Sequence, residues 1–372
     1  MENKILFVGP KPPPATGFAN IVIALKKVFI NHNLEVKFIS TLPPVGSSLF
    51  PTYKYKLLRL LFFPYSLIKF SLCLFKKNIV YINIHGGLSQ IYDIFIIALS
   101  RIFNKRIFLH HNSCSYVNEK SLISNILFRL AGKESTHIVS CLSMQNKIRE
   151  TYYAVNNVRY VSNLAILSLQ DKENFIPVYS SNISEEEIKI GYMSYVNKEK
   201  GIQTFCKTIN GITKSNISKK TIKGIVAGPI FDEDFVQNQK NRPNNNIDFQ
   251  GALYGKAFED FFKSIDILLF PTEYKHEAEP LTIYHSLSFG VPVISTQLGC
   301  LDEMLNSYDS CFAVSQNNFV SFASNFINEY TSKSLNERNK IRINLINEFR
   351  NQRQVEELKF FEVYKYLSII NE

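Results

Sequence analysis

A polar loop and the helix after it, around Glu277, hold the side chains best placed to do chemistry. In DILLFPTEYKHEAEPLTIYHSLSFGVPVIST, an apolar strand-like run leads to this loop, then to a helix from about Leu281 and to another strand. Pro280 suits a first helical turn, so the free amides near Leu281 and Thr282 would point at an anion such as phosphate. Glu277 could accept hydrogen bonds from sugar hydroxyls. The alternative is a solvated acidic loop that caps a helix.

Two adjacent histidines, His110 and His111, end a predicted parallel strand in RIFLHHNSCSY. The carboxyl ends of parallel strands face the ligand crevice of an α/β domain. Strand alternation puts the two side chains on opposite faces, so at most one points into a cleft. His111, which polar residues follow, is the better candidate, and a structural histidine is the alternative.

The first loop, GPKPPPATGFA, follows a predicted strand and precedes a helix that starts near Gly17. It lacks the Gly-x-Gly-x-x-Gly pattern, and the chain has no Gly-x-x-x-x-Gly-Lys-Ser/Thr loop, which argues against a nicotinamide dehydrogenase and a P-loop nucleotidase. Gly17 at a helix N-terminus would let a ligand's oxygens meet backbone amides. Otherwise it only turns the chain.

The elements that must position these residues alternate along the chain. Strands are expected at residues 5–8, 35–39, 79–84, 106–109, 138–141, 158–161, 188–193, 222–227, 247–249, 265–270, 293–295 and 311–314. Strands alternating with helices predict an α/β fold with parallel sheets. A polar stretch at 170–187 breaks the pattern, so we expect two doubly wound Rossmann-like domains, residues 1–175 and 176–350. Residues 351–372 should form a C-terminal helix that could pack back on the first domain.

Composition bounds the class of protein. The 372 residues are 45% hydrophobic and 20% charged, which fits a folded chain and argues against a polytopic membrane protein. The net charge of +10 favours an anionic partner. No basic leader precedes an apolar run at the start, so a cytoplasmic location is expected. The six cysteines form no Cys-x-x-Cys pair and predict neither a zinc site nor a disulfide framework.

Residues 54–77, KYKLLRLLFFPYSLIKFSLCLFKK, mix leucine and phenylalanine with six cations. Arg59, Pro64 and Lys69 interrupt the apolar runs, so the segment is expected to be too charged to span a bilayer, whereas a basic aromatic helix suits the headgroup region. The alternative is two ordinary core helices whose lysines reach out to water.

The spacing from Glu277 through Leu281 to Gly290, Pro292 and Val293 resembles the signature of retaining glycosyltransferases of family 4, which have the GT-B fold. The family pattern is Glu, seven residues, Glu, then Gly-x-Pro-Val. Four other places agree in order along the chain: the GP…TG loop, the strand end at His111, Lys200-Gly201 after a strand, and Phe249-Gln-Gly251 before a helix.

The resemblance implies two Rossmann-like domains whose parallel sheets face a central cleft. It implies a sugar nucleotide held mainly by the C-terminal domain, an acceptor entering from the N-terminal domain, and transfer with retained anomeric configuration. Position by position, Lys200 would neutralise the departing diphosphate and Glu277 would hold the donor sugar. His111 would lie beside the reacting centre, and Gly17 would let its loop approach the phosphates. No metal and no cofactor is implied, because side-chain cations and helix amides stabilise the leaving group in this fold.

Two positions depart from the family, and both fall on the donor site. His285 stands where the family has its second glutamate, and a neutral imidazole has only one acceptor nitrogen for the ribose hydroxyls. Tyr195 stands where an arginine is common, which removes a bidentate phosphate contact. Lys198 and Lys200 remain nearby and could compensate.

The resulting expectation is an enzyme that moves a sugar from a nucleoside diphosphate onto a lipid-linked oligosaccharide of a bacterial surface polysaccharide (O-antigen, capsule or exopolysaccharide), peripheral to the inner face of the cytoplasmic membrane. The basic aromatic stretch at 54–77 supports a membrane-bound acceptor. The alternatives are a sugar-nucleotide epimerase of the same fold and a weakened or inactive binding partner. No nucleic-acid-binding module is recognisable.

Overall fold

The computed structural model describes residues 4–14, 16–46, 52–170, 183–215, 220–243 and 245–369. The chain divides into two compact units, Met1–Phe175 with Arg353–Glu372, and Ile176–Gln352, called here the first and second unit. Most of the polar stretch at 170–187 lies outside the described residues.

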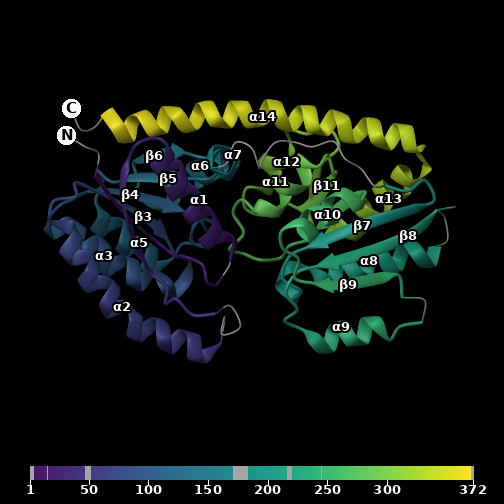
Figure 1. The fold of residues 1–372 in the computed structure, drawn as a ribbon, viewed down its shortest axis with the longest axis horizontal. Coiled ribbons are helices and arrows are strands. Elements are labelled where there is room, and N and C mark those ends of the chain that lie inside the picture. The colour runs from purple at the N-terminus through teal and green to yellow at the C-terminus, as the bar shows by residue number, and fades with distance from the viewer. Residues whose placement is uncertain are drawn as a thin grey trace. The chain divides into compact units, whose positions relative to one another are not determined.

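The first unit has a six-stranded sheet in the order β2-β1-β3-β4-β5-β6, with every pair parallel. Its strands are β1 (Lys4–Gly9), β2 (Glu35–Ser40), β3 (Ile79–Ile84), β4 (Arg106–His111), β5 (Thr136–Val139) and β6 (Asn157–Tyr160). Its helices are α1 (Gly17–Asn31), α2 (Tyr53–Leu74), α3 (Gln90–Ile102), α4 (Ser115–Asn118), α5 (Leu122–Ala131), α6 (Leu142–Thr151) and α7 (Asn163–Gln170). Right-handed crossovers put α1 and α3 on opposite faces of the sheet, because β1 to β2 and β3 to β4 step in opposite directions (Figure 1).

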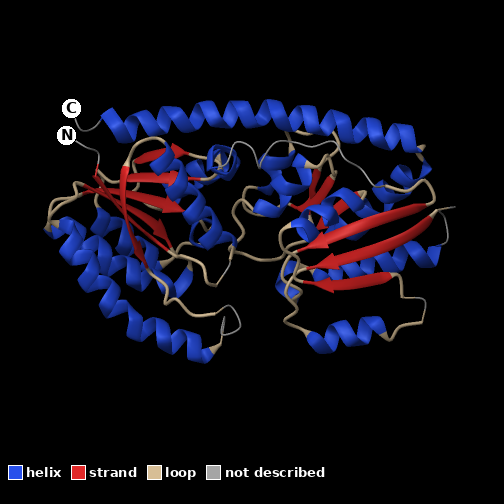
Figure 2. Ribbon diagram, in the orientation of Figure 1, coloured by secondary structure: helices blue, strands red, loops and turns tan. Residues whose placement is uncertain are grey.

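The second unit repeats this plan with a parallel sheet in the order β12-β11-β10-β7-β8-β9. Its strands are β7 (Glu187–Met193), β8 (Thr221–Ala227), β9 (Ile247–Gly251), β10 (Ile267–Phe270), β11 (Val293–Thr296) and β12 (Phe312–Val314). Its helices are α8 (Ile202–Ser215), α9 (Glu233–Lys240), α10 (Lys256–Ser264), α11 (Leu281–Ser288), α12 (Leu301–Leu305), α13 (Phe319–Ser332) and the first part of α14 (Leu335–Ile369), which belongs to the first unit from Arg353 onward. Figure 2 shows helices packed against the strands of each unit.

The expected α/β class with two doubly wound parallel sheets is confirmed. The central strands read as continuous apolar runs because helices cover both faces: all six residues of β3 and all four of β10 are buried. Several expected strand limits were wrong by one or two residues. β5 is two residues earlier than expected, in register with Phe108 of β4. β10 starts at Ile267 rather than 265, because the amide of Ile265 still bonds to Phe261 at the end of α10.

The long helix α14 is anchored through charged residues that an amphipathic pattern would leave in solvent. Arg338 and Arg342 are fully buried. Arg338 Nη1 donates to Asp266 Oδ1 at 2.9 Å, and Arg342 Nη1 donates to the carbonyl of Ile265 at 2.8 Å. The far end of α14 packs within the first unit, where Asn157 bonds to Tyr366 at 3.2 Å.

The segment at 54–77 forms one continuous helix, α2, with Pro64 inside it, and not two helices. Its buried residues are Tyr55, Ser66, Phe70 and Leu74. Among the described helices, α2 alone is long and apolar enough to cross a membrane, with a mean hydropathy of 1.6. The core helix of a soluble protein can be equally long and apolar. The expectation that its charges rule out spanning was therefore too strong.

Candidate functional site

The second unit brings Lys200 and Glu277 together at the carboxyl edge of its sheet. Lys200 follows β7 and Glu277 follows β10, which are neighbouring strands where the strand order reverses. Ligands of doubly wound sheets bind at such a switch point. Lys200 Nζ lies 2.6 Å from Glu277 Oε2, and the two side chains are only 13% and 11% exposed. Residues 77 positions apart in sequence thus form one partly desolvated ion pair.

A tight turn after β7 fixes the position of Lys200. The Asn197 side chain caps a 3₁₀ turn, Lys198–Lys200, by accepting from the Lys200 amide at 2.9 Å. Gly201 then turns the chain with φ of +80°. The buried phenol of Tyr192 lies 2.8 Å from the carbonyl oxygen of Tyr195 and 3.1 Å from that of Lys200, which ties both ends of the turn to the sheet.

Glu277 is set by close backbone packing around its loop. Thr272 Oγ1 donates to Glu277 Oε2 at 3.3 Å, beside the Lys200 contact. A Cβ added at Gly299, where φ is +59°, would come within 2.3 Å of the Glu277 carbonyl oxygen. The Cys300 amide donates to the carbonyl of Ala278 at 3.0 Å. The protein's own contacts therefore hold the carboxylate in place.

The start of α11 lies four residues beyond Glu277. Pro280 is its N-cap residue and makes no side-chain capping hydrogen bond, and no acidic residue occupies the first turn. Leu281 and Thr282 are partly exposed. A helix start of this kind favours an anion through its free amides and its dipole.

His285 lies on the next turn of α11 and packs against two rings of α10. Its ring meets Phe258 edge-on at 4.9 Å and stacks on Phe262 at 6.3 Å. Burial lowers the pKa of His285 to about 4, so the imidazole is neutral at physiological pH. Two aromatic rings thus line the His285 side chain.

Tyr195, before the turn, and Lys198, its first residue, differ in exposure and in charge. The Tyr195 ring packs edge-on against Phe231 at 5.1 Å, and burial raises its pKa, so the phenol carries no charge. Lys198 is exposed. Of these two residues, Lys198 alone offers a positive charge in place of the family's arginine.

The two predicted residues of the first unit lie on different elements, Gly17 on α1 and His111 on β4. Gly17 is the first residue of α1, whose N-cap Thr16 accepts from the Ala19 amide at 3.1 Å. A Cβ at Gly17 would have no atom within 4 Å, so the helix start has open space beside it.

His111 is fully buried, and His110 is only 1% exposed. His111 Nε2 lies 3.0 Å from His137 Nδ1, and His111 Nδ1 lies 3.0 Å from the Tyr116 hydroxyl. Burial, followed by the nearby His137 and His110, lowers the pKa of His111 well below its usual value. In the described structure neither adjacent histidine opens to solvent, and the catalytic role of His111 stays a prediction.

Sequence reasoning missed His85, which follows β3 at the switch point of the first sheet, between β1 and β3. Asp93 binds it twice: Oδ2 accepts the His85 amide and Oδ1 lies 2.9 Å from Nδ1. The Thr41 hydroxyl lies 3.1 Å from Nε2. The strand-end signal used for His111 applied equally to His85, but the strand order that favours His85 could not be seen in sequence.

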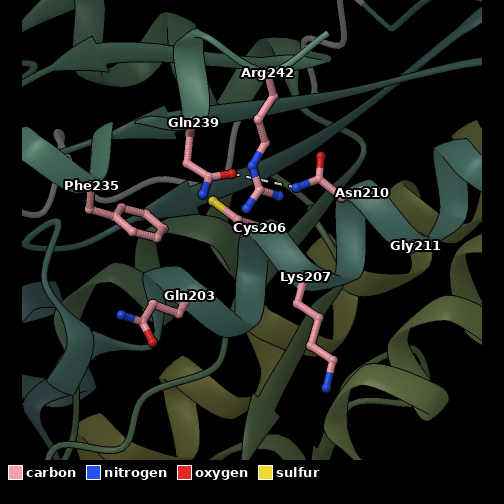
Figure 3. A pocket seen from close by; sticks show the side chains of 8 residues that line it. All are labelled: Gln203, Cys206, Lys207, Asn210, Gly211, Phe235, Gln239 and Arg242. Carbon is pink, nitrogen blue, oxygen red and sulfur yellow. Dashed lines mark hydrogen bonds between the residues drawn. The ribbon is translucent and has the colours of Figure 1, made fainter. Parts of the chain in front are cut away.

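A cavity of about 430 Å³ in the second unit contains none of the predicted site residues. It lies between α8 and α9 and is lined by Gln203, Cys206, Lys207, Asn210, Gly211, Phe235, Gln239 and Arg242. Figure 3 shows the Lys207 side chain extending away from Arg242, so the two cations do not converge on one point. Among the described residues, no cluster of three or more His, Cys, Asp or Glu could hold a metal ion.

Comparison with known proteins bears on the family and the fold of the chain. Residues 178–346 match the family model described as "Glycosyl transferases group 1". No curated protein sequence matches the chain.

Several solved structures share the fold over nearly the whole chain. HepE from Anabaena, in complex with UDP and glucose, is 13% identical with a TM-score of 0.63, covering 97% of this chain and 99% of its own. Sucrose-phosphate synthase from Thermosynechococcus elongatus is 13% identical with a TM-score of 0.71, covering 99% and 100%. The lipopolysaccharide outer core galactosyltransferase WaaB, in its apo form, is 13% identical with a TM-score of 0.61, covering 99% and 100%. At this identity the likeness establishes the fold, and it confirms the expected GT-B architecture.

Proposed function

We propose that this chain, which has the GT-B fold and whose residues 178–346 match the group 1 glycosyl transferases, moves a sugar from a nucleoside diphosphate onto a lipid-linked oligosaccharide. The product would be a bacterial surface polysaccharide. The second unit would bind the donor, and the first would bind the acceptor. Solved relatives of the same fold include HepE with bound UDP-glucose and WaaG, a glycosyltransferase of lipopolysaccharide biosynthesis.

The observation that carries the proposal is the Lys200–Glu277 pair at the switch point, 2.6 Å apart and within the matched segment. An ammonium at the same edge of the sheet as the start of α11 would offer positive potential to a departing diphosphate. The carboxylate offers acceptors to sugar hydroxyls. Together these groups provide leaving-group stabilisation from the protein itself, and we propose metal-independent transfer with retained configuration.

Calorimetry with UDP, GDP and their sugar conjugates tests the donor half of the proposal. One nucleotide should bind, and Lys200→Ala should weaken it by about tenfold or more, since a charge-assisted phosphate contact is worth about 1.5–3 kcal/mol. Lys207→Ala is the matched control, because that lysine is exposed on α8 and lies outside the site. If none of these nucleotides binds the purified chain, the enzyme proposal fails and an inactive binding partner becomes the better description.

Conversion of the donor without an acceptor separates transfer from epimerisation. A transferase should show only slow donor hydrolysis until a lipid-linked acceptor is added. Rapid interconversion of two sugar nucleotides in the absence of acceptor would replace our proposal with an epimerase.

The acceptor half of the proposal rests on the outer face of α2. Five of its exposed apolar side chains fall at helical spacing: Leu57, Leu61, Tyr65, Ile68 and Leu72, which are 47–68% exposed. We call these five residues the α2 stripe. Leu88 and, on α3, Ile91 and Phe95 extend the exposed apolar surface onto the 3₁₀ turn Gly87–Ser89 and onto α3, the helix against which α2 packs.

The charges around the α2 stripe have one sign. Lys54, Lys56 and Lys69 are exposed, and residues 53–77 contain no acidic side chain. Arg59 and Lys77 are not part of this surface: Arg59 donates to Ser89 at 2.8 Å, and Lys77 pairs with Glu35. An apolar face bordered by lysines suits the inner face of an anionic cytoplasmic membrane, where we propose the acceptor is met.

A further inference from the structure

Tyr274 lies directly over the ammonium of Lys200. The distance from Lys200 Nζ to the centre of the Tyr274 ring is 4.0 Å, well inside the range of a cation–π contact. The same nitrogen is 2.6 Å from Glu277 Oε2. The ammonium is therefore held from two directions, by a carboxylate and by a ring face.

The backbone that carries the Tyr274 ring is fixed by hydrogen bonds. The Tyr274 amide donates to Thr272 Oγ1 at 3.3 Å, and the Tyr274 carbonyl accepts from the Glu277 amide at 2.9 Å. One residue earlier, the Glu273 amide donates to the Glu199 carbonyl at 2.8 Å, which joins this loop to the turn that carries Lys200. The contact between ring and ammonium thus follows from two tied loops rather than from a free side chain.

The chemistry of an ammonium gives this arrangement a consequence. A lysine has three N–H donors. One points at Glu277, and the ring face covers another direction, which leaves the third for a ligand. Burial, with Glu277 next in size, raises the pKa of the Tyr274 phenol, so the ring stays neutral at physiological pH.

We propose that Tyr274 is a positioning residue of the donor site, which holds the Lys200 ammonium against Glu277 so that its remaining N–H meets the donor diphosphate. This inference rests on the proposed function. It adds a residue outside the Glu277-to-Val293 pattern, at a position where the sequence shows only a tyrosine in a polar loop.

A double-mutant cycle on nucleotide binding tests the inference, using whichever of UDP or GDP binds the wild-type chain. Tyr274→Leu should weaken the diphosphate by about tenfold, the size expected of a partly desolvated cation–π contact, and should leave binding of the corresponding nucleoside unchanged. Tyr274→Phe, which keeps the ring, should bind as the wild type does. In a Lys200→Ala background, Tyr274→Leu should have no further effect.

Two results would overturn the inference while leaving the proposed function intact. The first is an equal loss from Tyr274→Leu with and without Lys200, which would mean that the ring only supports the loop. The second is a loss from Tyr274→Phe as large as that from Tyr274→Leu.

Acylation of lysines followed by mass spectrometry tests the same contact without any nucleotide. Lys200 should react several-fold faster in Tyr274→Leu than in the wild type, while exposed Lys207 should react equally in both. If the wild type binds no nucleotide, the proposed function fails, and unchanged Lys200 reactivity would then reject the contact as well.

Discussion

Gly201 approaches Pro271 so closely that a Cβ on Gly201 would lie 1.8 Å from the Pro271 carbonyl oxygen. Gly201 follows Lys200, and Pro271 begins the loop that carries Tyr274 and Glu277. The ion pair of the candidate site therefore depends on a backbone contact that only glycine permits, both by space and by its φ of +80°.

Gly201→Ala should push the two loops apart and separate Lys200 from Glu277. We expect a loss of about 2 kcal/mol or more in the free energy of unfolding, together with loss of nucleotide binding. Urea denaturation and calorimetry measure the two effects.

Gly211→Ala is the matched control. Gly211 lies in α8, the helix that follows Gly201, and a Cβ at Gly211 would meet no atom within 4 Å. It should be neutral or stabilising by up to about 1 kcal/mol, because alanine is the better helix former. Equal effects of the two substitutions would contradict the assigned role of Gly201.

The strands, and the positions of Lys200 and Glu277 after two of them, could be predicted from the sequence. Buried parallel strands are short apolar runs, and Lys200 and Glu277 follow two of them, so a family pattern could be fitted to both. That Lys200 and Glu277 lie next to each other could be seen only from the strand order. This order places β7 beside β10, although β8 and β9 intervene in sequence.

Residues that act through tertiary contacts were missed. Tyr274 sits in a loop without periodicity, so nothing local indicated that its ring covers Lys200. Arg338 and Arg342 look like solvent-facing charges of a helix, and only the fold shows them buried against Asp266 and the carbonyl of Ile265. The orientation of Arg59 toward Ser89 was hidden in the same way.

The buried histidines of the first unit should make the chain sensitive to acid. Burial lowers the pKa of His110 and of His137 to about 3. In the unfolded chain these imidazoles take up protons near pH 6.5, so between about pH 3 and 6.5 the unfolded state binds more protons. Stability should be full above pH 6.5 and fall as the pH drops, by up to about 1.4 kcal/mol per pH unit for each such histidine.

His137→Gln should reduce that slope by about one proton between pH 6 and 5, whatever its effect on stability at pH 7. Urea denaturation at a series of pH values measures the slope for each protein. A slope identical to that of the wild type would mean that His137 does not control the acid response.

His285 is expected to be adapted to its surroundings rather than a damaged glutamate. Because Phe258 and Phe262 surround it, His285→Glu would press a carboxylate against two phenyl rings and cost about 1–3 kcal/mol in stability. We expect weaker nucleotide binding in calorimetry, whereas His285→Gln, which is uncharged, should stay near the wild type. A gain in nucleotide affinity from His285→Glu would show instead that the site had lost a useful carboxylate.

The α2 stripe should decide whether the chain binds membranes. Leu61, Ile68 and Leu72 are 63–68% exposed, so replacing all three with serine removes apolar surface without opening the core. Burying even half of each side chain in a bilayer is worth about 1 kcal/mol, so the triple variant should bind vesicles at least tenfold more weakly. The wild type should sediment with vesicles that contain one third phosphatidylglycerol and less with pure phosphatidylcholine, since Lys54, Lys56 and Lys69 border the stripe.

Val355→Ser with Leu358→Ser supplies the control, because these α14 side chains are 44% and 69% exposed and lie outside the α2 stripe. This variant should bind vesicles as the wild type does and keep transfer to a lipid-linked acceptor, while the stripe variant should lose that transfer yet still bind nucleotide. Equal vesicle binding by the wild type and the stripe variant would contradict a membrane role for the α2 stripe, because three of its well-exposed apolar side chains would then contribute nothing at the lipid surface.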